Sequence, residues 1–120
     1  LKSVTLWGSG NAIREFLYVD DLAKYCIKIM NLSKKKYEKY TDERCSHINI
    51  GTGKGIKISK LANKISNLVG YEGKIKFNKS YPDGHPKKIL NINKLKKITN
   101  TKFIDLDDGL RISYSDFLTK

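Results

Sequence analysis

The sequence is poor in several residue types, and each shortage excludes a class of protein. It holds two cysteines, Cys26 and Cys45, which are too few for a disulfide framework and do not form a metal site. No apolar run approaches the roughly 20 residues that a transmembrane helix requires. The charged, apolar and small-residue zones of a signal peptide are also missing. We therefore expect a reduced, cytoplasmic protein without a membrane partner.

Methionine is scarcer still, because Met30 is the only one and the chain begins with Leu1. An open reading frame begins with methionine, so we expect the chain to be a fragment of a longer protein. Its 120 residues suit one domain with a modest core.

Acidic residues are half as numerous as basic ones, 12 against 24, so the formal net charge is +12. Such a charge is typical of proteins that bind nucleic acid or another polyanion. Only three basic residues are arginines, however, and the lysines are spread among many isoleucines and asparagines. Because these three residue types share AT-rich codons, coding bias explains the charge better than nucleic-acid binding does. The densest run, 34–36, is interpreted as a solvated loop. A basic polyanion-binding module stays open as the alternative from another class.

Strand and helix patterns alternate along the chain. Short apolar or alternating runs predict strands at 4–7, 47–50 and 74–78, and an extended piece at 16–19 that leads into a helix. Apolar spacings of three and four predict helices over 20–30, 58–69, 93–98 and the residues after Asp105. The lysine-rich stretch 33–44 is expected to be an insertion loop. This alternation favours an α/β fold.

The glycine-rich stretch 51–55 lies between a predicted strand and a predicted helix, where a pyrophosphate could bind. Its spacing is G-x-G-x-G, whereas the dinucleotide fingerprint is G-x-G-x-x-G. The next predicted strand ends in Asn78 and Lys79, where a ribose-binding acid would be expected. We interpret the stretch as a structural connection and assign no cofactor-binding residue.

Catalytic pairs are missing as well. The acid/base pattern Tyr-x-x-x-Lys does not occur at any of the seven tyrosines. His47 and His85 have no partner at metal-ligand spacing. We expect His47 to be structural in the strand that it opens and His85 to be hydrated. No catalytic residue and no metal ligand are therefore assigned to this sequence.

Two loops are more polar than packing alone requires. At the start of the first loop, the indole ring of Trp7 could stack on an aromatic or sugar ring. Further along the same loop, Arg14 could pair with a phosphate. In the loop that follows Pro82, Asp83 can accept hydroxyl protons from a sugar, and Lys88 offers a point charge to a phosphate. This chemistry is compatible with a ligand site and also with an ordinary surface.

The same two loops carry a resemblance to a known family. Residues 4–23, VTLWGSGNAIREFLYVDDLA, resemble the GDP-L-fucose synthase patterns W-G-S/T-G-x-x-x-R-E/Q-F and V-D-D-[LM]-A. The R-E/D-F-x-[HY]-V-x-D part is shared across the extended short-chain dehydrogenase/reductases. Residues 82–88, PDGHPKK, resemble the family's P-D-G-x-P-[RK]-K. Segments 46–53 and 69–73 add matches, so the resemblance covers essentially the whole chain.

The resemblance implies a fold and a location for the catalytic and cofactor-binding residues. Residues 1–120 would be the C-terminal substrate-binding part of an extended short-chain dehydrogenase/reductase with a Rossmann-like N-terminal core. Residues of about 20–52 would return the last strand and helix to the Rossmann sheet. The nicotinamide-binding glycines, the catalytic Ser, Tyr and Lys, and the family's acid/base Cys and His would all lie upstream. The cysteines and histidines of this chain do not fill those places, and Asn91 stands where bacterial members often have Asp.

The resemblance also implies an activity. Such enzymes convert GDP-4-keto-6-deoxy-D-mannose to GDP-L-fucose by epimerising C3 and C5 and then reducing C4 with NADPH. A 4-keto group acidifies the protons on both adjacent carbons, so one site can epimerise both. By the family pattern, four residues fall on substrate-binding positions: Arg14 and Lys88 at the phosphates, and Asp83 and Trp7 at the polar and planar parts of the nucleotide-sugar.

Further expectations follow from the same resemblance. NADP(H) would bind to the upstream part, the whole protein would be a homodimer, and the fragment alone would be inactive and incompletely stable. The alternative within the class is the same chemistry on another GDP-4-keto sugar, such as a 6-deoxy-heptose for capsule synthesis.

Overall fold

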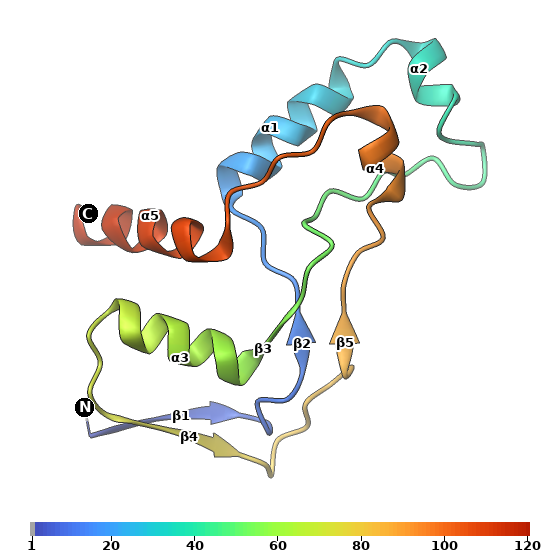
Figure 1. Ribbon diagram of the computed structural model, residues 1–120. Coiled ribbons are helices and arrows are strands. Elements are labelled where there is room, and N and C mark those ends of the chain that lie inside the picture. The colour runs from blue at the N-terminus through green and yellow to red at the C-terminus, as the bar shows by residue number, and fades with distance from the viewer. Residues whose placement is uncertain (1) are drawn as a thin grey trace.

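A computed structural model describes residues 2–120 as a mixed α/β chain (Figure 1). Its elements in order are β1 (Ser3–Trp7), β2 (Ile13–Arg14), α1 (Val19–Met30), α2 (Lys34–Glu38), β3 (Ile56–Lys57), α3 (Ile58–Leu68), β4 (Lys74–Asn78), β5 (Lys87–Lys88), α4 (Asn93–Ile98) and α5 (Leu106–Leu118). The strands at 4–7 and 74–78 and the helices at 20–30, 58–69 and 93–98 are thus confirmed to within one residue at each end.

Two small sheets organise the chain, and both pair segments far apart in sequence. β1 and β4 are parallel, in a register that runs from Ser3 opposite Lys74 to Trp7 opposite Asn78. The second sheet has the order β3-β2-β5, with β2 antiparallel to β3 and parallel to β5. In Figure 1 the β1–β4 pair lies below α3, and the second sheet leads away from it toward α1 and α4.

The core is small and joins α1 to α4 and to the segment before α5. Tyr25, Ile92 and Leu95 form its fully covered centre. The hydroxyl of Tyr25 accepts the Lys102 N–H at 2.6 Å, and its ring lies against Phe103 with centroids 4.7 Å apart. Buried polar groups need such partners, so these contacts determine where the segment before α5 lies.

The overall shape is open. The principal extents are 57 × 35 × 20 Å and the radius of gyration is 17.8 Å, whereas a compact domain of this length has about 13.6 Å. Large apolar side chains stay exposed, among them Val19 at 66%, Met30 at 82% and Phe117 at 74%. Among residues 2–120, no helix combines the length and apolar character needed to cross a bilayer.

One predicted strand is wrong, because residues 47–50 belong to no strand and are not buried. In the extended piece expected at 16–19, Tyr18 has extended backbone, but α1 already begins at Val19. His47, expected to be structural in a buried strand, is exposed. A strand requires a neighbouring strand to pair its backbone N–H and C=O groups, and among residues 2–120 none pairs with 47–50.

The lysine-rich stretch 33–44 is not simply a loop, because it contains the short helix α2. The side chain of Ser33 accepts the N–H of Lys36 and caps the first turn. The three lysines 34–36 are exposed, as predicted, but they are helical rather than irregular.

Candidate functional site

The two polar loops meet because the strands before them are parallel neighbours. β1 and β4 run in the same direction, so their carboxyl ends, at Trp7 and Asn78, lie at the same edge. The first loop turns through Gly8 and Gly10, whose φ values of +85° and +77° favour glycine over any other residue. The second loop leads from β4 to Asp83. Segments more than 70 residues apart thereby form one surface.

Asp83 links the two loops. One of its carboxylate oxygens accepts the Ser9 N–H at 2.6 Å, and the other accepts the Ser9 hydroxyl. The hydroxyl bond, then the backbone bond, and finally the charge of Arg14 lower the pKa of the Asp83 carboxyl below its ordinary value. This carboxylate is therefore ionised at neutral pH and carries a negative charge between the loops.

Arg14 and Lys88 are brought together by the second sheet. They lie opposite each other in the parallel register of β2 and β5. One terminal nitrogen of Arg14 donates to the carbonyl of Asp83 at 3.2 Å, and the other donates to the carbonyl of Ile13 at 2.8 Å. Arg14 and Lys88 thus line one cavity of about 640 Å³ together with a third cation, Lys87. The other lining residues are Glu15, Leu17, Ile50, Gly51, Ile89 and Leu90.

Trp7 lies at the tip of the same loop pair but does not line this cavity. Its side chain is 72% exposed. Its ring stacks on that of Tyr81, with centroids 4.4 Å apart and planes only 8° from parallel. The structure therefore brings Arg14 and Lys88 together and links Arg14 to the Asp83 carbonyl, whereas neither Asp83 nor Trp7 lines the cavity. The Trp7 ring has a partner, Tyr81, that sequence reasoning missed. The signal for that partner was an aromatic residue directly before Pro82.

Glu15 is a second residue that sequence reasoning missed, and it determines the structure of the glycine-rich stretch. Its Oε1 accepts the Gly53 N–H at 2.7 Å and the Thr52 hydroxyl at 3.2 Å. Its Oε2 accepts the Leu90 N–H at 2.7 Å. The protein's own carboxylate thus takes the place where a pyrophosphate cradle would need a free amide. Among the described residues, this stretch does not fit a dinucleotide.

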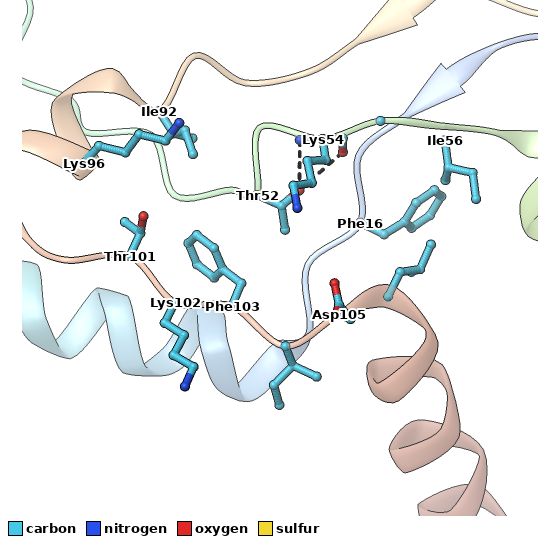
Figure 2. A pocket seen from close by; sticks show the side chains of 13 residues that line it. Phe16, Thr52, Lys54, Ile56, Ile92, Lys96, Thr101, Lys102, Phe103 and Asp105 are labelled. Carbon is cyan, nitrogen blue, oxygen red and sulfur yellow. Dashed lines mark hydrogen bonds between the residues drawn. The ribbon is translucent and has the colours of Figure 1, made fainter.

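A second cavity, of about 450 Å³, also borders the glycine-rich stretch (Figure 2). Figure 2 shows Phe16 and Phe103 on different sides of it and Lys54 directed toward it. The Thr52 hydroxyl, which donates to Glu15, also accepts the Lys54 N–H at 3.2 Å. None of the four predicted substrate-binding residues lines this cavity. We therefore place the candidate site at the cavity of Arg14 and Lys88.

Comparison with known proteins agrees with the motifs. The profile of the NAD dependent epimerase/dehydratase family matches residues 1–51. The GDP-L-fucose synthase of Escherichia coli strain K12 is 42% identical over 115 residues, which cover 96% of this chain and 36% of that protein. The chain thus spans about a third of the length of the curated relatives it matches.

Solved structures give the same result. A GDP-6-OMe-4-keto-L-xylo-heptose reductase from Campylobacter jejuni matches with a TM-score of 0.88 and 36% identity, over 98% of this chain and 34% of that one. A GDP-mannoheptose C4 reductase from the same organism, solved with NADP bound, matches with a TM-score of 0.81 and 32% identity, over 98% and 35%.

The fold is that of part of an extended short-chain dehydrogenase/reductase, the class to which the matched nucleotide-sugar reductases belong. Within that group, the chain is related over nearly its whole length to the GDP-L-fucose synthases, which confirms the resemblance carried by its two polar loops.

Proposed function

We propose that this chain forms the C-terminal, substrate-binding part of an NADPH-dependent GDP-4-keto-sugar epimerase/reductase. The substrate is GDP-4-keto-6-deoxy-D-mannose, which is epimerised at C3 and C5 and reduced at C4 to GDP-L-fucose. The observation that carries the proposal is the register of β2 and β5, which sets Arg14 and Lys88 side by side on one cavity. Two neighbouring cations suit the two phosphates of a nucleoside diphosphate.

Each predicted residue has a role that its surroundings support. Arg14 and Lys88 bind the diphosphate, and the exposed face of Trp7 receives the planar base. Asp83 has a double role, because Ser9 takes one lone pair on each oxygen and leaves the others for a sugar hydroxyl. These residues bind and orient the substrate, and none of them performs the epimerisation or the reduction.

In this proposal the cofactor binds to another part of the protein. NADPH supplies the hydride for C4, but the described residues offer it no cradle, because Glu15 occupies the Gly53 amide. We propose that the cofactor binds to a Rossmann-like part that precedes this chain, together with the catalytic residues. Residues of about 20–52 would return to that part, and the whole protein would be a cytoplasmic homodimer. The open shape and the exposed apolar side chains support a chain completed by further surface.

The test is an assay of the natural protein, in the length in which it is expressed. NADPH oxidation is followed with GDP-4-keto-6-deoxy-D-mannose, and the product's C3 and C5 configurations are determined by NMR. We expect turnover that Arg14→Ala and Lys88→Ala weaken mainly through KM, because each removes a phosphate contact. Absence of turnover and of GDP binding in the natural protein would refute the proposal.

One observation favours a second candidate substrate. The matched Campylobacter reductases are named for GDP-heptoses, and one of them has a TM-score of 0.88 to this chain. A GDP-4-keto-heptose shares the GDP moiety and differs in the sugar, so the same phosphate and base contacts would serve it. A kcat/KM at least about tenfold higher for the heptose, equivalent to about 1.4 kcal/mol in transition-state binding, would favour this candidate.

A further inference from the structure

We propose that Tyr81 is a positioning residue for base recognition, because its ring holds the Trp7 indole so that the opposite indole face receives the guanine base. This inference rests on the proposed function and adds to it a residue outside the family pattern. It predicts that Tyr81 contributes to binding of the base and contributes nothing to binding of the phosphates.

The geometry of the ring pair determines which face is free. The centroids of Trp7 and Tyr81 are 4.4 Å apart and the planes differ by 8°. Paired aromatic rings lie with centroids about 4.5–7 Å apart, so no third ring fits between these two. Trp7 is 72% exposed and Tyr81 is 41% exposed. A planar ligand can therefore stack on the outer face of Trp7 while Tyr81 covers the inner one.

A single carbonyl holds both aromatic residues in place. The C=O of Asn78 accepts the N–H of Gly8, next to Trp7, at 2.9 Å, and also the N–H of Tyr81 at 3.3 Å. The hydrogen bonds between Ser9 and Asp83 link the same two loops a second time. Backbone contacts thus hold the two loops together, so the stacking does not depend on the two rings alone.

Holding the indole before the ligand arrives reduces the conformational entropy that binding would otherwise cost. Stacking of a base on an aromatic ring depends on the π-face and not on charge. Removal of the Tyr81 ring should therefore free the indole and weaken a nucleotide, while inorganic pyrophosphate, which has no ring, should be unaffected. This difference separates a positioning role from a general loss of structure in the loop.

The experiment is calorimetric titration of the natural protein with GDP and, separately, with inorganic pyrophosphate. The variants are Tyr81→Ala, Tyr81→Phe and Trp7→Ala, and the matched control is Tyr40→Ala, which removes a tyrosine in the distant lysine-rich segment. We expect Tyr81→Ala to raise the Kd for GDP about three- to tenfold, the contribution of one aromatic pair. Its Kd for pyrophosphate should stay unchanged, and Tyr81→Phe should bind GDP like the wild type.

The outcomes separate this inference from the proposed function. If Trp7→Ala weakens GDP binding but Tyr81→Ala does not, the role of Tyr81 is refuted and the proposed function stands. If Tyr81→Ala weakens GDP and pyrophosphate equally, Tyr81 serves the loop as a whole and the inference is refuted. If the wild type binds neither ligand, both the inference and the proposed function are refuted.

Discussion

Ser9 supplies both of the hydrogen bonds that the Asp83 carboxylate accepts, one from its backbone N–H at 2.6 Å and one from its hydroxyl. The two residues are 74 positions apart in sequence. This pair is therefore a tertiary contact that joins the loop after β1 to the loop after β4.

The first prediction concerns pH. The pKa of Asp83 is lowered in the fold, so its link to Ser9 is fully present above the ordinary aspartate pKa of about 3.9 and is lost as pH falls through the lower folded value. Ser9→Ala removes the hydroxyl, which is the largest cause of the shift, and should move the transition to higher pH. The measurement is Trp7 emission against pH, with Trp7→Phe subtracted. Asp83→Asn should show no transition; a transition that Ser9→Ala leaves in place would contradict the link.

The second prediction concerns Gly8. An added Cβ at this position would collide with the Asp83 carboxylate, and its φ of +85° is unfavourable for alanine. Gly70 is the matched control, because it has a φ of +67° but open space around its Cβ position. Both Gly8→Ala and Gly70→Ala should lose about 1–3 kcal/mol of unfolding free energy to backbone strain. Only Gly8→Ala should also change Trp7 emission; equal spectra would show that no collision occurs.

The third prediction concerns Glu15. Glu15→Gln replaces one accepting oxygen by an NH₂ donor, which must face the N–H of Gly53 or of Leu90. We expect a loss of about 1–3 kcal/mol, measured by urea unfolding, because one amide is left without an acceptor. The control is Glu38→Gln, which removes only an exposed contact of 3.7 Å to Lys34 and should hardly change stability. Equal effects of the two variants would refute the central role of Glu15.

The fourth prediction concerns the core. Leu95 is completely buried beside Tyr25 and Ile92, whereas Leu118 at the end of α5 is 64% exposed. Leu95→Ala should cost about 2–5 kcal/mol because it leaves a cavity. Leu118→Ala should change the unfolding free energy by no more than about 0.5 kcal/mol. Thermal and urea unfolding of both variants would measure this difference, and a similar loss for Leu118→Ala would show that α5 packs against further surface.

Local patterns predicted the parts of the fold that depend on neighbours in sequence. The helix α3 follows from apolar residues three and four positions apart, and a helix satisfies its own backbone hydrogen bonds. The strand expected at 47–50 is wrong for the converse reason. Its apolar residues are present, but a strand needs a partner strand that the local sequence does not specify.

The sequence by itself determined the helices α1, α3, α4 and α5, the α/β class and the residue types in two polar loops, because these depend on spacing and composition. Only the tertiary structure decided that Arg14 lies opposite Lys88, that Ser9 binds Asp83, and that Tyr81 stacks on Trp7. It also decided that the glycine-rich stretch binds Glu15. Each of these contacts joins residues 37 to 74 positions apart, and such pairings arise from strand register and packing, which no local pattern encodes.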